Sequence, residues 1–308
     1  MIKINKKIAS ILLIALSTMI IGCSNNEKDL NAEEDNIIKI GLMPAVDTAP
    51  ILLAEKNGYF EEEGIKVEIE IYNNAQNRQS ALQSYQIDAA MTDFIALATN
   101  VDGGFDIKAT TMTDGTFPVL SKAEAIDKKD IKVAMMEVSV TNYLVDMWLA
   151  DKYNIEKVFI TEIPARLAAI STGEVDMGLF PEPVASNGEL QGLTKTLYGL
   201  EDEYSPDCLV FTGKAIEEKP NTIKAFHRAY NKAVEELNSN QDLVREILVE
   251  KIPNINPEIK EKIVIPTYKK ASLPSNEYVE SIIEWTEKTL NKDLSVDSKV
   301  LLDDQFIK

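Results

Sequence analysis

One sequence pattern, typical of a helix followed by a strand, occurs twice along this chain. The segment from Arg78 to Asp88 aligns without gaps to the segment from Arg166 to Asp176, and each copy predicts a helix, a tight turn and a strand. Upstream of each copy, the apolar segment 38–43 is echoed at 131–136. Convergence of two ordinary helix-turn-strand units is the alternative to an internal repeat. Under either origin, the pattern predicts two similar α/β lobes.

Strand and helix patterns alternate through the first third of the chain. Strands are predicted at 37–43, 66–72, 87–91 and 107–112, with helices at 48–63, 76–85 and from residue 93. This order predicts a parallel sheet. From Pro220 onward the pattern is mostly helical, with further stretches at 242–251, 257–264 and 275–290. We expect this helical tail to return and cover the first lobe.

The N-terminal 23 residues are typical of an export signal. Lys3, Lys6 and Lys7 precede an unbroken run of apolar and small residues that leads to Gly22-Cys23. This ending resembles the lipobox of bacterial lipoproteins, in which the cysteine receives a diacylglycerol and becomes the new N-terminus. Two acyl chains anchor a protein stably. The alternative is an uncleaved signal anchor in which Cys23 is incidental. Residues 24–36 are polar and charged, and we expect them to be a flexible tether.

Composition limits the class of partner. The 308 residues carry a formal net charge of -18, which repels polyanions and argues against nucleic acid as a partner. The chain is too long for a single core, so two domains are expected. With Cys23 acylated, Cys208 is left without a partner for a disulfide and is expected to be a small buried hydrophobe.

Several segments together resemble a known family. The segments 50–67, 82–90, 172–176, 181–183 and 219–226 are similar to the extracytoplasmic solute-binding proteins of ABC importers. Within that family they resemble the branch that includes sulfonate, taurine, nitrate and thiamine-precursor binders, although Tyr85 stands where this branch usually has glycine. The resemblance implies an α/β, two-lobed, periplasmic-binding-protein-like fold of type II. Its first lobe would comprise residues 36–120 plus 214–308 and its second lobe residues 121–213, with crossovers near 119–122 and 209–214.

The resemblance also implies where the protein works and with what. We expect a lipoprotein on the outer face of the bacterial cell membrane, held to the bilayer through acylated Cys23. Its partners would be a small-molecule solute and an ABC permease, and we expect a monomer without a cofactor or a bound metal. No nucleophile-base pair or metal-ligand cluster is evident, and His227, the single histidine, falls on the amphipathic tail helix. We therefore do not expect an enzyme.

Candidate ligand-binding residues follow the predicted strands, because ligands of α/β sheets sit beyond the carboxyl ends of the strands. They are Asp47, Thr48, Asp93, Phe94, Asp114, Glu137, Ser139, Thr141, Phe180, Glu182 and Asp207. Several of them have plainer alternatives, since the polar ones at helix starts can be N-caps and the phenylalanines can pack in a core. Arg78 and Arg166 sit at helix starts, where a cation opposes the helix dipole. A ligand, a carboxylate or a surface salt bridge can hold them.

Carboxylates outnumber cations among these positions. We therefore expect a neutral or cationic, nitrogenous and planar solute, such as an aminopyrimidine that serves as a thiamine precursor, because carboxylates accept strong hydrogen bonds from such groups. The alternatives are an anion binder of the sulfonate, taurine or nitrate type, an enzyme on the same fold, and a sensor that docks on a membrane receptor.

Overall fold

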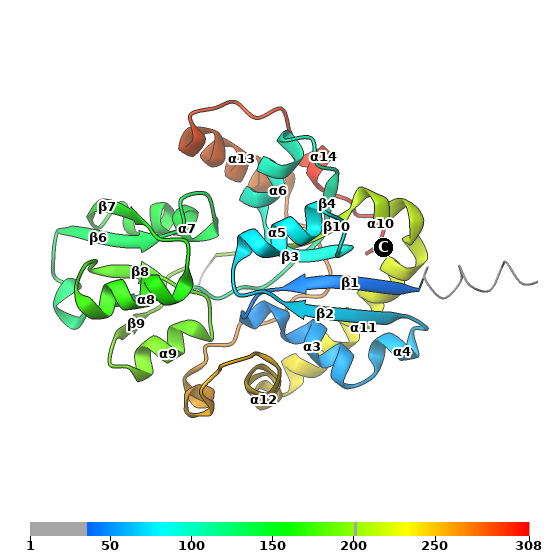
Figure 1. The fold of residues 1–308 in the computed structure, drawn as a ribbon, viewed down its shortest axis with the longest axis horizontal. Coiled ribbons are helices and arrows are strands. Elements are labelled where there is room, and N and C mark those ends of the chain that lie inside the picture. The colour runs from blue at the N-terminus through cyan, green and yellow to red at the C-terminus, as the bar shows by residue number, and fades with distance from the viewer. Residues whose placement is uncertain (1–35, 200–201, 308) are drawn as a thin grey trace, which may run out of the picture.

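Two mixed β-sheets organise the chain (Figure 1). The computed structural model describes residues 36–199 and 202–307; the expected signal peptide, Cys23 and the tether up to residue 35 lie outside the described residues. The first sheet has the order β2-β1-β3-β10-β4 and the second the order β7-β6-β8-β5-β9. The first is built from β1 (Ile37–Leu42), β2 (Lys66–Ile71), β3 (Ala89–Asp93), β4 (Ile107–Met112) and β10 (Asp207–Thr212). The second is built from β5 (Val119–Ser121), β6 (Asp130–Met135), β7 (Asn154–Phe159), β8 (Met177–Leu179) and β9 (Thr194–Thr196).

One strand of each sheet runs against the others, so the prediction of a parallel sheet is wrong in this respect. Strand β1 is parallel to β2 and β3, and β6 is parallel to β7 and β8. Strand β10 is antiparallel to β3 and β4, and β5 is antiparallel to β8 and β9. Each of these strands enters its sheet from the other lobe, and therefore from the opposite end.

The links between the sheets differ from the expected crossovers. Residues 119–121 and 207–212 are strands, so the chain leaves the first sheet after Met112 and returns to it at Asp207. Residues 207–212, which the sequence-based boundaries assigned to the second lobe, pair with the first sheet. We call each sheet with its covering helices a lobe, and strand β10 therefore belongs to the first.

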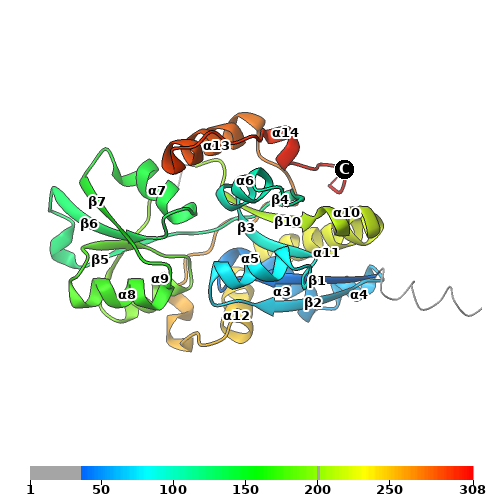
Figure 2. The same cartoon turned by 45° about the horizontal axis from the view of Figure 1, so that its top comes forward.

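Helices cover both faces of the first sheet (Figures 1 and 2). Successive residues of a strand point to opposite faces; accordingly, Ala89 and Met91 of β3 join one core cluster while Ala90 joins another. The first cluster includes residues from α3 (Ala49–Lys56), α11 (Pro220–Ser239) and α12 (Gln241–Lys251). The second includes residues from α5 (Ala75–Gln83), α6 (Phe94–Asp102) and α13 (Asn276–Leu290). The second sheet carries α7 (Val140–Leu149), α8 (Ile163–Thr172) and α9 (Val184–Leu190).

The long helix expected at 48–63 is broken. The structure has a 3-10 turn, η1 (Val46–Thr48), then α3, and then a separate short helix, α4 (Tyr59–Glu62). Gly58, between α3 and α4, has a φ of 73°, a conformation that glycine adopts at little cost and that a continuous helix does not allow. Tyr85, at the position where the family usually has glycine, also has a positive φ, of 57°.

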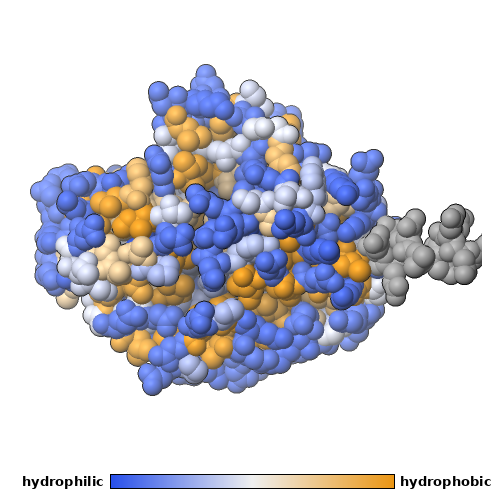
Figure 3. Space-filling model, viewed as in Figure 1, coloured by the Kyte–Doolittle hydropathy of each residue, from blue (hydrophilic) through white to orange (hydrophobic). Residues whose placement is uncertain are grey.

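The tail packs on the first lobe, as expected, and also reaches the second. Helix α11 lies on α3, and Leu302, after α14 (Ser298–Leu301), bridges to Ala109 of β4. On the second lobe, Trp285 Nε1 donates to Asp146 Oδ2 of α7 at 2.9 Å. The segment expected as a helix at 257–264 is a 3-10 helix, η3 (Pro257–Lys262), which contacts α9. The remaining short elements are α10 (Gly213–Glu218) and η2 (Ala123–Ala125). Hydrophilic and hydrophobic residues are interspersed on the face shown in Figure 3.

Candidate ligand-binding site

A cavity of about 240 Å³ lies between the two lobes. It is bordered by the loops that follow β1, β3, β6 and β8, and by the first turns of α5, α7 and α8. These are the carboxyl ends of parallel strands and the N-termini of helices, where an α/β fold offers free backbone N–H groups. The polar residues that line it are Asp47, Thr48, Gln76, Arg78, Gln79, Thr92, Asp93, Asn100 and Asp207 from the first lobe, and Ser139, Thr141 and Arg166 from the second.

The N-terminus of α7 forms part of the second-lobe wall. Ser139 has extended backbone geometry and caps the helix, with its Oγ accepting from Thr141 N at 3.2 Å. The hydroxyl of Thr141 lies 2.8 Å from Ser139 Oγ and accepts from Met136 N at 3.1 Å. Because the helix has ten residues, its dipole leaves partial positive charge at this end, which favours an anion.

Two buried arginines come from equivalent positions of the repeat. Arg78, in the first turn of α5, is 5% exposed, and Arg166, near the start of α8, is 2% exposed. Arg78 Nη2 donates to Thr92 Oγ1 at 2.9 Å, and Arg166 Nη1 donates to Leu179 O at 3.3 Å. Among the described residues, the Nε atom of each has no hydrogen-bond partner, and no ion pair joins either guanidinium to a carboxylate.

Burial makes both cations unfavourable in the absence of a counter-charge. It lowers the pKa of Arg166 to about 10, with only the charge of Glu162 acting in the opposite direction. The guanidinium of Arg166 also lies over the ring of Phe180, 5.4 Å from its centroid. Burial lowers the pKa of Arg78 as well, and the charge of Asp93 is the largest effect that opposes this. The alternative that a surface salt bridge holds each arginine is not met among the described residues, because both side chains are buried and neither forms an ion pair there.

The first-lobe wall carries three carboxyl groups. Asp47 Oδ2 accepts from Thr113 Oγ1 at 2.9 Å, Asp93 Oδ1 accepts from Ala96 N at 2.7 Å, and Asp207 Oδ2 accepts from Ser205 Oγ at 3.0 Å. Asp93 is thus also the N-cap of α6.

Burial shifts all three groups in the same direction. It raises the pKa of Asp47 to about 6, and it raises that of Asp93. It raises the pKa of Asp207 well above the usual range, and the charges of Asp47 and Asp93 add to the effect. A ligand amine placed near these groups would favour their ionised forms.

Six of the eleven predicted residues line this cavity: Asp47, Thr48, Asp93, Ser139, Thr141 and Asp207. Whether they bind a ligand stays a prediction. Thr48 does not cap α3 with its side chain; its hydroxyl instead donates to Ala45 O at 2.7 Å.

The structure places the other five outside the lining. Phe94 and Phe180 are at most 1% exposed and pack in core clusters, because they continue buried strand segments. Asp114 turns to the tail and accepts from Lys269 N at 2.6 Å. Glu137 is exposed, and its carbonyl accepts from Asn142 Nδ2. Glu182 is fully buried in an ion pair with Lys195.

Comparison with known proteins identifies the family. The family model described as NMT1/THI5 like matches residues 45–243, well over half of the chain. The chain belongs to the NMT1/THI5-like family. A protein of Bacillus subtilis (strain 168) that is named for binding aliphatic sulfonates is 24% identical to it, over 97% of this chain and 95% of that protein. This family assignment agrees with the resemblance drawn from the sequence.

Solved structures of similar proteins share the fold. The zinc-bound ligand-binding component of an ABC-type import system from Staphylococcus aureus has a TM-score of 0.75 at 18% identity, over 88% of this chain and 97% of that one. The periplasmic aliphatic sulphonate-binding protein of Escherichia coli has a TM-score of 0.72 at 16% identity, over 87% and 92%. The predicted two-lobed periplasmic-binding-protein fold is confirmed. These relatives are described as binding proteins, in line with the prediction that the chain is not an enzyme.

The described residues contain neither a candidate metal site nor a candidate membrane-spanning helix. Within residues 36–199 and 202–307, no group of three or more His, Cys, Asp or Glu side chains is arranged to hold a metal ion. None of the helices in those ranges combines the length and the apolar character needed to cross a bilayer.

Proposed function

We propose that this protein is the solute-binding component of an ABC importer and that it holds a small organic solute between its lobes. The observation that carries the proposal is the cavity lined from both lobes, to which Arg166 contributes a buried guanidinium that forms no ion pair with the described residues. A buried cation without a counter-charge is unfavourable, so a site of this kind is suited to a ligand that brings one. The family and the descriptions of its relatives support the same role.

The two walls differ in charge, which points to a solute with two unlike ends. Among the described lining residues, the second-lobe wall has Arg166 and the N-terminus of α7 but no carboxylate. The first-lobe wall has three carboxyl groups around one arginine. We propose that an anionic group such as a sulfonate faces the second lobe and that a nitrogen group that donates hydrogen bonds faces the first. Aliphatic side chains, among them Met43, Met91 and Ile163, surround the space between.

The size of the cavity restricts the solute. Pockets for drug-sized ligands generally enclose about 300–1,000 Å³. A volume of about 240 Å³ is below that range and suits a small metabolite. A short aminosulfonate such as taurine has both kinds of end and the right size.

An aminopyrimidine is the second candidate for the ligand. The three carboxyl groups can accept hydrogen bonds from its amino group and ring, and Phe117 lies in the lining as a stacking surface. This ligand leaves Arg166 without a counter-charge, which is why we favour the aminosulfonate.

A set of four solutes tests both candidates by isothermal titration calorimetry. The protein is prepared without its lipid and refolded from denaturant, so that any bound solute is removed. Taurine carries both end groups, ethanesulfonate lacks the amine, ethylamine lacks the sulfonate, and an aminopyrimidine represents the alternative. We expect taurine to bind most tightly and ethanesulfonate next. Tight binding of the aminopyrimidine with no response to either sulfonate would rule out the aminosulfonate proposal.

We further propose that the protein is a monomeric lipoprotein, anchored outside the cell membrane through Cys23, and that it delivers its solute to a permease. The Gly22-Cys23 lipobox supports the anchor. Metabolic labelling with a radioactive fatty acid should mark the wild-type chain and leave a Cys23→Ala variant unlabelled. Deletion of the gene should reduce uptake of the solute, and unchanged uptake would contradict a transport role.

A further inference from the structure

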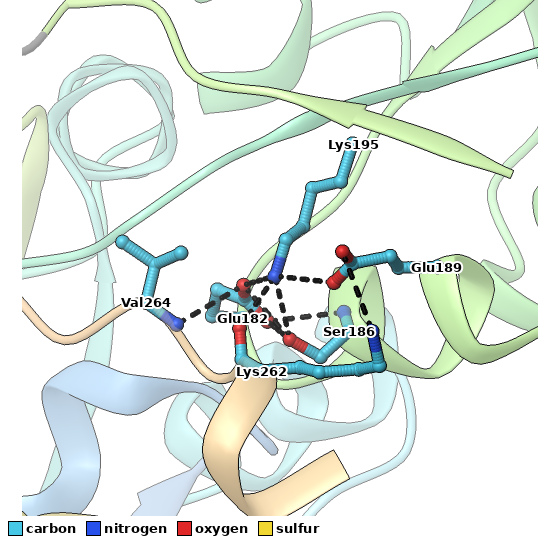
Figure 4. Close-up of polar contacts among 6 residues, drawn as sticks. All are labelled: Glu182, Ser186, Glu189, Lys195, Lys262 and Val264. Atoms are coloured by element: carbon cyan, nitrogen blue, oxygen red, sulfur yellow. Dashed lines mark hydrogen bonds and ion pairs between the residues drawn. The ribbon is translucent and has the colours of Figure 1, made fainter. Parts of the chain in front are cut away.

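A polar cluster with a buried centre lies where β9, α9 and η3 meet (Figure 4), and none of its members lines the cavity. It consists of Glu182, Ser186, Glu189, Lys195 and Lys262, and we call it the interlobe cluster. Four of its members belong to the second lobe, while Lys262 ends η3 in the C-terminal tail. None of its members contacts the solute in the proposed binding mode.

Lys195 is the centre of the cluster. Its Nζ donates to Glu182 Oε1 at 2.9 Å, to Ser186 Oγ at 2.9 Å and to the backbone oxygen of Lys262 at 2.6 Å. Glu189 Oε2 lies 3.0 Å from the same nitrogen. The Glu182 side chain is fully buried and that of Lys195 is 8% exposed. All three donor positions of the ammonium group are therefore engaged, and one of them by the tail.

Further contacts join the cluster to the first lobe. Glu182 Oε1 accepts from Val264 N at 3.3 Å, and the backbone oxygen of Glu182 accepts from Val46 N at 2.9 Å. Val46 belongs to the core of the first lobe, as do Ile259 and Ile263, which flank Lys262 in the tail. A single residue of the second lobe, Glu182, thus holds two separate segments that pack on the first.

The residues that make these contacts are sequence neighbours of residues that line the solute cavity. Pro181 precedes Glu182 and lines the cavity, and Asp47 follows Val46 and lines it from the other side. A shift of the Glu182 backbone relative to Val46 would therefore move both walls. Because buried charges are tolerated only with their partners in place, separation of the lobes would leave Lys195 without Lys262 O and Glu182 without Val264 N–H.

We propose that Glu182 and Lys195 are positioning residues that hold the two lobes in the arrangement that forms the cavity. They do so by tying the second lobe to the tail and to Val46, the first residue of η1. Their relevance to solute capture depends on the proposed function, because affinity scales with the fraction of molecules in the binding-competent arrangement. The tie itself exists in the solute-free protein and can be tested there.

The test compares two lysine variants by hydrogen–deuterium exchange without any solute. Lys195→Met removes the tie. Lys219→Met is the matched control, because Lys219 Nζ likewise donates to a carboxylate, Asp88 Oδ2 at 3.0 Å, and to a backbone oxygen, Ile37 O at 2.9 Å. All three of these control residues lie within the first lobe. Glu182→Gln, which keeps the shape of the side chain, is the second test variant.

We expect Lys195→Met to speed exchange of the Val46 and Val264 amides by at least about tenfold, which corresponds to the loss of about 1.4 kcal/mol. Glu182→Gln should have a smaller effect in the same direction, and small-angle X-ray scattering should show a larger radius of gyration for both. Lys219→Met should lower the melting temperature without changing exchange at these two amides. Unchanged exchange in Lys195→Met, or an equal increase in Lys219→Met, would show that the cluster is only a local support and would overturn the proposal. Neither result depends on which solute binds.

Discussion

Replacement of Arg166 by methionine should make the solute-free protein more stable and weaken its affinity for solute at least a hundredfold. Methionine keeps the apolar stem that packs near Phe180 and removes the buried charge. Burial lowers the pKa of Arg166 to about 10, so the charged form is disfavoured in the fold by about 3 kcal/mol at 1.36 kcal/mol per pKa unit. Loss of the hydrogen bond to Leu179 O offsets about 1 kcal/mol, and loss of the contact with the ring of Phe180 offsets up to about 1 kcal/mol.

The net expectation for Arg166→Met is a gain of about 1–2 kcal/mol in the free energy of unfolding, or roughly 5 °C in melting temperature. Urea and thermal unfolding of refolded, solute-free protein measure it. Titration with taurine should show at least a hundredfold weaker binding, since a buried charge pair is lost. Arg228→Met is the control: its guanidinium is largely exposed and pairs with Glu63, so stability should change by less than about 0.5 kcal/mol. A destabilised Arg166→Met variant that binds solute normally would mean that Arg166 is structural, and the reasoning would fail.

Three further predictions follow from buried titratable groups. Burial lowers the pKa of His227 to about 3, so at this residue only the unfolded chain binds a proton as pH falls below about 6.5. The wild type should therefore lose roughly 2.5 kcal/mol in its free energy of unfolding between pH 7 and 4.5, and His227→Gln should not show this loss. Urea unfolding at both pH values measures the difference. Burial raises the pKa of Asp47 to about 6, so its charge is lost as pH falls through 6. Calorimetry should therefore show weaker taurine binding below pH 6 in the wild type. The Asp47→Asn variant should show little pH dependence of binding. Cys208 is fully buried and burial raises its pKa well above the usual range, so mass spectrometry should find it unlabelled by a thiol reagent until denaturant is added, and rapid labelling of the native protein would contradict this.

The sequence predicted the two lobes because their cause is local. Hydrophobic periodicity sets each strand and helix, and the repeat of Arg78 to Asp88 at Arg166 to Asp176 shows that the same unit is used twice. The direction of a strand within its sheet, in contrast, depends on the path of the whole chain and not on the residues of that strand. Strands β5 and β10 are antiparallel because the chain enters each sheet from the other lobe, and nothing in their residues records that route.

The sequence predicts a residue at the cavity correctly where its position between a strand and a helix is enough to determine its location. Asp47, Asp93 and Ser139 follow strands and begin helices, and the structure puts them at the cavity. Glu182 also follows a strand, but its position is set by Lys195, thirteen residues further on in another strand, and by the distant tail. Such a partner cannot be read from a single sequence.

The sequence carries one indication that the two arginines are special. A cation at the start of a helix opposes the dipole, and the repeat puts one at the same point in both lobes. Surface salt bridges are common enough that this signal alone could not separate a solvated arginine from a buried one. Burial depends on how the two lobes meet, which is a tertiary property.

The position of β10 between β3 and β4 has a consequence for biosynthesis. During synthesis, β4 emerges long before β10, and the entire second sheet lies between them in the chain. Until β10 arrives, β3 and β4 have no strand to join them and keep unpaired edges. The inserted second lobe can complete its own hydrogen bonding earlier, whereas the first must wait for a contact between distant parts of the polypeptide, which is slow to form. Premature termination after Thr196 but before Asp207 would therefore leave a nascent chain with a complete second sheet and an open, aggregation-prone first sheet.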